Sequence, residues 1–310
     1  MNKTPLLIIA GPTASGKSGL GVKLARLLDG EIISADSMQV YRGMDIGTAK
    51  ITAEEAMGVP HHLIDAVDPD EEWNVREFCL RARPIIDGIA SRGKLPIVVG
   101  GTGFYIRALA YGAEFEEEEE SGIREELEKL PTEELYEKLR AVDPESAEAI
   151  HPNNRKRVIR AIEFYMQNES PISAHNEQMR AKESPYRLCC LVLDPPRAEL
   201  YRRIEERVDE MRAQGLTEEV RGLLSRGCER GLVSMQGLGY KEIAAFLCGE
   251  CTEDEAYANV KLGTRHFAKR QLTWFRREQD AVFIDVTEDK EKLLADALAV
   301  IREKLGEQQP

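Results

Sequence analysis

The chain has 310 residues, a formal net charge of −13, and a composition that is 42% hydrophobic and 31% charged. These values are typical of a folded globular protein with one large domain or a core domain carrying a subdomain, and they exclude a disordered or fibrous chain. No run approaches the roughly 20 apolar residues of a membrane-spanning helix, and the apolar stretch before Gly11 is too short for a signal peptide. We therefore expect a cytoplasmic protein that does not enter a membrane, with a monomer as the expected oligomeric state.

The negative charge is concentrated in one segment. Residues 114–150 hold 15 acidic and 4 basic side chains, so the rest of the chain carries a net charge of only −2. An acidic run such as 116–120 is ordinarily a solvated linker or helix face, and its role stays open. The six cysteines show no regular framework, and the Cys248/Cys251 pair lacks the further ligands of a zinc site, so we interpret all six as reduced thiols.

The elements follow in chain order as short apolar runs that alternate with helical patterns, which is typical of a parallel α/β sheet. Strands are expected at 6–10, 31–35, 62–65, 95–99, 188–193 and 281–286. Helices are expected at 18–28, at 75–90 after the cap Asn74, from about 197 to Gly215, from the capping box at Thr252 to Phe275, and from Thr287 through Ile301.

Residues 114–186 differ in character, because they carry no strand signal. Helical periodicity covers 124–130, 132–141 and 155–168, and prolines separate these stretches. The predicted fold is therefore an α/β, P-loop NTPase-like parallel sheet flanked by helices, formed by residues 1–113 and 187–310, with an all-helical insertion subdomain at 114–186.

A phosphate-binding loop lies between the first strand and the first helix. The stretch GPTASGKS matches the pattern GxxxxGK[ST] in the strand–loop–helix context that the motif requires. Glycines let backbone N–H groups point inward, Lys17 supplies a positive charge, and Ser18 supplies a hydroxyl ligand for Mg²⁺. The expected diphosphate-binding or nucleotide-binding residues are Gly11, Pro12, Thr13, Ala14, Ser15, Gly16, Lys17 and Ser18.

The usual carboxylate of a nucleotide hydrolase is displaced. The strand 95–99 runs into Gly100, Gly101, Thr102 and Gly103 without an acidic residue, and no guanine-reading motif occurs. Asp36 instead follows the strand expected at 31–35, at the carboxyl edge where an open α/β sheet binds ligands, beside the phosphate-binding loop. Asp36 is either a reactive carboxylate, with a possible share in binding Mg²⁺, or a simple cap for the following turn.

Together these motifs closely resemble those of the tRNA dimethylallyltransferases, also called tRNA isopentenyltransferases. The resemblance covers nearly the whole chain up to residue 277. It is carried by residues 11–18, 34–50, 61–65, 100–103, 151–160, 239–242 and 269–276.

The resemblance implies transfer of a dimethylallyl group from dimethylallyl diphosphate to N6 of the adenosine directly 3′ of the tRNA anticodon, with Mg²⁺ as cofactor. It also implies Asp36 as the general base, Thr102 as a partner of the reacting groups, and Arg157 or Arg160 as the partner of the leaving diphosphate. The choice between the two arginines stays open at this point.

Two basic stretches are compatible with the RNA partner that the resemblance implies, although a basic helix face with buried aromatics is also common in soluble proteins of other functions. Residues 261–277 hold six Lys and Arg residues and no acidic one, and 155–160 hold four bases in six residues. Reaching an N6 amine inside a stacked anticodon loop requires the base to be extruded. By the resemblance, the expected tRNA-binding residues are Asp36, Ser37, Met38, Gln39, Thr102, Arg124, Lys156, Arg157, Arg160, Gly239, Tyr240, Lys241, Lys269, Arg270, Gln271, Trp274 and Arg276.

Two other functions fit the bare motifs. A small-molecule or nucleotide kinase would share the phosphate-binding loop and the sheet, with the helical insertion as its lid. A non-catalytic, nucleotide-regulated RNA-binding module would also carry a phosphate loop and basic surfaces, although Asp36 beside an intact Lys17 and Ser18 argues against it.

Overall fold

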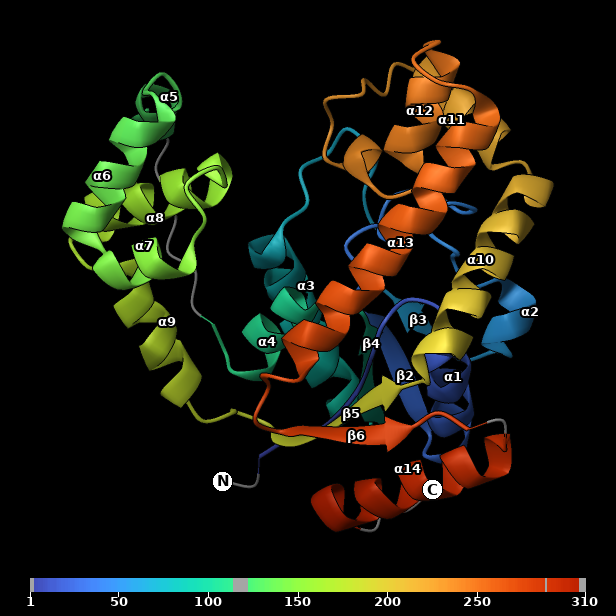
Figure 1. Ribbon diagram of the computed structural model, residues 1–310. Coiled ribbons are helices and arrows are strands. Elements are labelled where there is room, and N and C mark those ends of the chain that lie inside the picture. Colours follow the sequence, from blue (N-terminus) through green and yellow to red (C-terminus); the bar gives the residue numbers. More distant parts are fainter. Residues whose placement is uncertain (1–2, 114–121, 288, 307–310) are drawn as a thin grey trace. The chain divides into compact units, whose positions relative to one another are not determined.

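The computed structural model describes residues 3–113, 122–287 and 289–306 (Figure 1). The chain divides into two compact units, one formed by Met1–Ala110 with Ser184–Pro310 and the other by Tyr111–Glu183. The boundaries expected from sequence, 114 and 186, lie a few residues from these. The acidic run 116–120 lies outside the described residues.

The first unit is built on a six-stranded parallel sheet, in the order β3-β2-β4-β1-β5-β6. Its strands are β1 Pro5–Ala10, β2 Gly30–Ser34, β3 His61–His62, β4 Leu95–Gly100, β5 Arg187–Asp194 and β6 Ala281–Asp285. β1 is central, with Leu7 in register with Ile97 on one side and with Cys189 on the other. Both faces of β1 and β4 are buried, which explains the continuous apolar runs of these two strands. The predicted α/β fold with a parallel sheet is confirmed.

Helices cover both faces of this sheet (Figure 1). The helices of this unit are α1 Lys17–Leu27, α2 Ala53–Ala56, α3 Val75–Ser91, α4 Gly103–Ala110, α10 Arg197–Gln214, α11 Leu216–Ser225, the 3₁₀ turn η1 Ser234–Gln236, α12 Tyr240–Leu247, α13 Glu253–Phe275 and α14 Lys290–Leu305, of which α11 and α12 pack on other helices rather than on the sheet. On one face, Leu24 of α1 and Ile301 of α14 join Leu7 and Ile97 in one apolar cluster. α3 and α4 contact β4 and cover the other face, which receives the alternate strand residues. Among the described residues, no helix has the length and apolar character needed to cross a bilayer.

The second unit contains only helices among its described residues. They are α5 Ile123–Glu128, α6 Thr132–Val142, α7 Pro144–Ala149, α8 Arg155–Asn168 and α9 Ile172–Ala181. Leu135 and Leu139 of α6 pack against Val158 and Ile162 of α8 in a separate apolar core. The unit therefore has its own stabilising interior, as a subdomain needs.

Two expected elements differ from those observed. In place of the strand expected at 62–65, the structure has the two-residue strand β3, which ends at His62. The pairing ends there because Leu63 (φ 61°) and Asp65 (φ 51°) adopt left-handed backbone conformations. The last helix begins at Lys290 rather than near Thr287, since the side chain of Asp289 caps the N–H groups of Glu291 and Lys292.

Candidate active site

The phosphate loop lies at the carboxyl end of β1, in the middle of the sheet. Gly11 (φ 148°) has no room for a side chain, because a Cβ there would lie 3.1 Å from the carbonyl oxygen of Leu193. Gly16 (φ 91°) and Ala14 (φ 61°) are also left-handed, as a loop that turns its N–H groups inward requires. Ser15 is 1% exposed, and the described residues supply no partner for its hydroxyl. A buried hydroxyl without a partner costs about 1 to 3 kcal/mol, which a phosphate oxygen would remove.

Two partly buried cations face this loop. Lys17 donates from Nζ to the carbonyl oxygen of Pro12 at 3.3 Å, and burial lowers the pKa of its ammonium from 10.5 to about 8, against the opposing charge of Asp36. Arg207 of α10 donates to the hydroxyl of Thr13 at 3.5 Å, and burial lowers the pKa of its guanidinium as well. Two desolvated cations beside an anion-shaped loop provide charge complementarity for a diphosphate.

Gln271 of α13 joins the phosphate loop to the β4–α4 loop. Its Oε1 accepts from the backbone N–H of Thr13 at 2.9 Å, and its Nε2 donates to the carbonyl oxygen of Gly101 at 2.9 Å. The side chain is 7% exposed, and its amide is engaged at both ends. Gln271, expected to bind tRNA, therefore positions two active-site loops from the interior.

Asp36 begins the turn that follows β2. Its Oδ1 accepts from the backbone N–H of Met38 at 2.9 Å and of Gln39 at 3.4 Å, so the turn-capping alternative is present in the structure. The hydrogen bonds described for this carboxylate all end on Oδ1. Its negative charge also favours the charged forms of Lys17 and Arg207, and so opposes the lowering of their pKa values by burial. Capping and proximity to the phosphate loop therefore coexist at this residue.

Thr102 lies beside the same turn. Its Oγ1 accepts from the backbone N–H of Ser37 at 3.2 Å, and its own N–H donates to the carbonyl oxygen of Ala35 at 3.3 Å. The strand ends are close here, because a Cβ on Gly100 would lie 2.2 Å from the carbonyl oxygen of Ala35. The ends of β2 and β4 thus bring Asp36 and Thr102 together.

The side chain of Trp274 packs against the loop between β4 and α4. Its indole packs so tightly on Gly103 that a Cβ there would lie 2.2 Å from Cδ1. Its ring meets Phe104 edge to face, with centroids 6.3 Å apart, and Phe104 is 53% exposed. Trp274 is partly buried, and its contacts are with the active-site loop.

The donor set fits a Mg²⁺ ion that is shared with a substrate. Ser18 is exposed at the end of the loop, and the carboxylate of Asp36 is near enough to the preceding residue, Lys17, for its charge to act on the pKa of that side chain. Within the described residues there is no group of three or more His, Cys, Asp or Glu side chains arranged for a metal. Mg²⁺ commonly needs only one or two protein ligands when phosphates supply the others, so this arrangement suits the ion.

The arginines of α8 belong to the second unit. Arg157 and Lys156 are exposed in the first turn, whereas Arg160 pairs with Glu163 at 3.4 Å. Arg124 also approaches this carboxylate, at 3.8 Å. Since Glu163 is 6% exposed, two guanidinium groups gather around one buried charge.

The remaining residues expected to bind tRNA divide into surface and interior positions. On α13, Lys269 and Arg270 are exposed, and Arg276 is exposed with an ion pair to Asp194 at 3.6 Å. Tyr240 is fully buried and donates its hydroxyl to Glu219 at 2.7 Å. The ring of Tyr240 is therefore part of the core, and a contact of residue 240 with tRNA stays a prediction.

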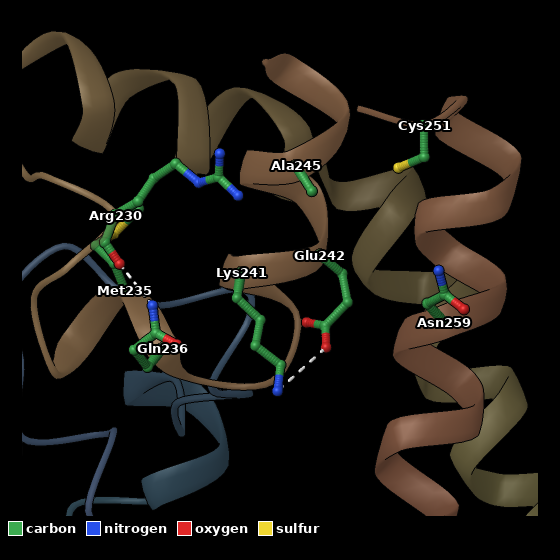
Figure 2. Close-up of a pocket in the computed structure, with 8 residues that line it drawn as sticks. All are labelled: Arg230, Met235, Gln236, Lys241, Glu242, Ala245, Cys251 and Asn259. Carbon is green, nitrogen blue, oxygen red and sulfur yellow. Dashed lines mark hydrogen bonds and ion pairs between the residues drawn. The ribbon is translucent and has the colours of Figure 1, made fainter. Parts of the chain in front are cut away.

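Lys241 lines a cavity of about 360 Å³ between η1, α12 and α13 (Figure 2). Its Nζ lies 3.7 Å from the carboxylate of Glu242, and the amide of Gln236 donates to the carbonyl oxygen of Arg230 at 2.6 Å. Glu242 also accepts from the N–H of Gly239, which begins α12 at φ 93°. Gly239 therefore shapes the helix start, and Lys241 remains the accessible cation of this motif.

Comparison with known proteins identifies the family. Residues 39–278 match the model of the IPP transferase family. The chain belongs to the IPP transferase family. A tRNA dimethylallyltransferase of Lachnoclostridium phytofermentans is 52% identical over 97% of this chain and 98% of its own length.

Solved structures agree with this family assignment. The full-length tRNA isopentenylpyrophosphate transferase of Bacillus halodurans is 43% identical, with a TM-score of 0.74 over 98% of both chains. A eukaryotic dimethylallyltransferase acting on tRNA is 28% identical, with a TM-score of 0.84 over all of this chain and 81% of its own. This IPP transferase therefore shares both sequence and fold with enzymes that modify tRNA.

Arg207 is the site residue of this IPP transferase that sequence reasoning missed. It lies on α10 three residues after Ile204 and four before Met211, both of which are buried. A positive charge on the apolar face of an amphipathic helix was the signal that could have found it.

Proposed function

We propose that this chain transfers a dimethylallyl group from dimethylallyl diphosphate to N6 of the adenosine directly 3′ of the anticodon of a tRNA, and that it releases diphosphate. Family membership supports transfer to tRNA. The observation that carries the donor is the phosphate loop, in which Lys17 and Arg207 face an anion-shaped backbone beside Asp36.

The donor's diphosphate would occupy the loop. Its oxygens would accept from the loop N–H groups and from the hydroxyl of Ser15, and Lys17 and Arg207 would neutralise its charge. Mg²⁺, held by Ser18 and the diphosphate, would supply further charge stabilisation when bound. These interactions would favour the departing diphosphate most, because it gains negative charge in the transition state.

The acceptor amine would approach from the side of Asp36. The N6 nitrogen forms a bond to C1 of the dimethylallyl group, the bond from C1 to the diphosphate oxygen breaks, and the amine proton passes to the carboxylate of Asp36. Oδ1 is engaged by Met38 and Gln39, so Oδ2 would take the proton. The hydroxyl of Thr102, which already bonds to the same turn, would position the amine or the diphosphate.

The basic surfaces would bind the RNA. Lys269, Arg270 and Arg276 of α13 and Lys241 of α12 would contact backbone phosphates. Within the second unit, Arg157 is exposed while Arg160 and Arg124 share the buried carboxylate of Glu163, so Arg157 is the arginine of α8 that is more open to an anion.

One incubation tests this function. The protein is mixed with labelled dimethylallyl diphosphate, Mg²⁺ and unmodified tRNA, and the nucleosides are then separated. We expect N6-dimethylallyladenosine and one diphosphate per transfer, with no requirement for ATP. A kinase would instead consume ATP with an acceptor, and a binding module would retain tRNA without a covalent product under any donor.

A further inference from the structure

A single carboxylate fastens the loop that follows the Asp36 turn. Glu219, in the first turn of α11, accepts three consecutive backbone N–H groups: Oε2 from Asp45 at 2.9 Å and Ile46 at 2.7 Å, and Oε1 from Gly47 at 3.1 Å. Oε1 also accepts the hydroxyl of Tyr240 at 2.7 Å. Successive N–H groups that converge in this way form a nest for an anion, and here the anion is supplied by the protein itself.

The buried ring of Tyr240 fixes the other side of this contact. It is so close to Gly47 that a Cβ there would lie 2.5 Å from the ring. Burial raises the pKa of the Tyr240 hydroxyl, and the charge of Glu219 raises it further, so the hydroxyl stays a donor at physiological pH. The position of residues 45–47 is therefore set by α11 and α12 together.

The loop held by Glu219 is also bonded to the turn that contains Asp36, through the side chain of Gln39. The amide of Gln39 donates to the carbonyl oxygens of Thr48 at 3.2 Å and Ala49 at 3.4 Å, immediately after the nest. The N–H of Gln39 is also one of the two donors to Oδ1 of Asp36. Hydrogen bonds joined by short stretches of backbone thus connect Glu219, through the nest and Gln39, to Asp36.

The phosphate loop is connected differently. Its described side-chain links run through Gln271 to Gly101 and through Arg207 to Thr13, and neither includes Glu219 or the 45–50 loop. A change at Glu219 should therefore reach the acceptor side of the site most directly, and it reaches the donor side less directly, through the charge of Asp36 on Lys17 and Arg207.

We propose that Glu219 is a positioning residue for the RNA acceptor: its carboxylate fills the backbone nest at 45–47 and, through Gln39, sets the orientation of the Asp36 turn. The inference rests on the proposed function, in which this turn receives the target adenosine. Glu219 does not touch either substrate and acts only through the loop it holds.

The first experiment compares E219Q with the matched control E218Q. An amide keeps the shape of Glu219 but offers one acceptor oxygen where the carboxylate offers two, whereas Glu218 is 73% exposed and only pairs with Arg221. For E219Q we expect kcat/KM for an anticodon stem-loop to fall at least tenfold, while the Kd for dimethylallyl diphosphate changes less than twofold. E218Q should match wild type in both. A wild type that forms no product refutes the proposed function, whereas an active wild type with a fully active E219Q refutes this inference alone.

A double-mutant cycle tests the connection through Gln39. If Glu219 acts through Gln39, E219Q and Q39A lose largely the same interaction. The kcat/KM of the double variant should then be no more than about twofold below that of the less active single variant. Multiplicative losses of kcat/KM would mean that Glu219 acts independently of Gln39 and would overturn the proposed connection.

Chemical rescue separates positioning from general stability. E219A leaves the nest and the space of the missing carboxylate, so added acetate should restore stem-loop transfer at least fivefold, whereas the neutral acetamide should not. Acetate should leave wild type and E218Q unchanged. Equal effects of acetate and acetamide would contradict the anionic nest. Should E219A not fold, the cycle with E219Q and Q39A decides the question.

Discussion

Binding of dimethylallyl diphosphate is expected to take up a proton at Lys17 when the pH exceeds about 8. In the free protein, burial lowers the pKa of Lys17 from 10.5 to about 8, and the charge of Arg207 lowers it further while that of Asp36 raises it. A diphosphate beside Nζ adds opposing negative charge and should return this pKa towards its ordinary value. Proton binding and donor binding are therefore linked.

The magnitude follows from that shift. A group with a pKa near 8 is about 90% charged at pH 7 and about 10% charged at pH 9. Proton uptake should therefore rise from about 0.1 per donor bound at pH 7 to about 0.9 at pH 9, and the Kd should increase about tenfold per pH unit above 8. In the free protein, the charged form of the buried ammonium is disfavoured by about 3 kcal/mol, so stability should rise with pH between about 8 and 10.5.

Calorimetric titrations in two buffers of different ionisation enthalpy measure this uptake directly. Lys17→Ala should lose the pH-dependent uptake along with most of the affinity, whereas Lys23→Ala, an exposed lysine on the same helix, should behave as wild type. Equal uptake at pH 7 and 9 in the wild type, or uptake that persists in Lys17→Ala, would refute the reasoning.

Three further outcomes are expected. Asp36→Asn should keep the turn cap but lose the proton acceptor, so the single-turnover rate at saturating substrates should fall by about 10² to 10⁴ with folding unchanged; a near-normal rate would leave Asp36 as a cap only. Replacing Lys269 and Arg270 by Ala should flatten the logarithmic salt dependence of tRNA binding by about 1.4 to 1.8, and an unchanged slope would remove α13 from the RNA surface. Glu31→Gln should lower the free energy of unfolding at pH 7 by about 1 to 3 kcal/mol. Burial raises the pKa of Glu31, but hydrogen bonds from His62 and Arg92 outweigh burial and lower it, so this stabilisation should be complete above pH 4.5 and disappear below it; a difference between variant and wild type that is the same at pH 3 and 7 would contradict the assignment.

The elements with strong local signals could be predicted from sequence. β1, α1 and the phosphate loop follow from an apolar run, a glycine pattern and a helical face, and each boundary is within one residue of the expected one. Asn74 and Thr252 cap their helices as expected, because a cap depends on residues three positions apart. The helix α2 was missed, since its four residues give too little periodicity. The helix α11 was missed although Leu216, Val220 and Leu223 follow a helical spacing.

The approach of Asp36 to Thr102 was also foreseeable, because parallel neighbouring strands end at the same edge of a sheet. The contacts of Arg207, Gln271 and Glu219 could not be foreseen from the sequence. Each joins residues more than 170 positions apart, and the sequence gives no register between α10, α11 or α13 and the loops they touch.

The sequence by itself determined the family, the parallel sheet and the place of the anion site, since each depends on short patterns of residue type. Only the tertiary structure decided which side chains serve the site. Gln271 and Tyr240 carry polar groups that sequence reasoning assigned to RNA, yet burial turns them inward, where their hydrogen bonds must be satisfied by the protein. Arg207 shows the converse, because packing of α10 brings a charge from an apolar helix face to the phosphate loop. Burial and long-range packing depend on the whole chain at once, so no local pattern could have distinguished these roles.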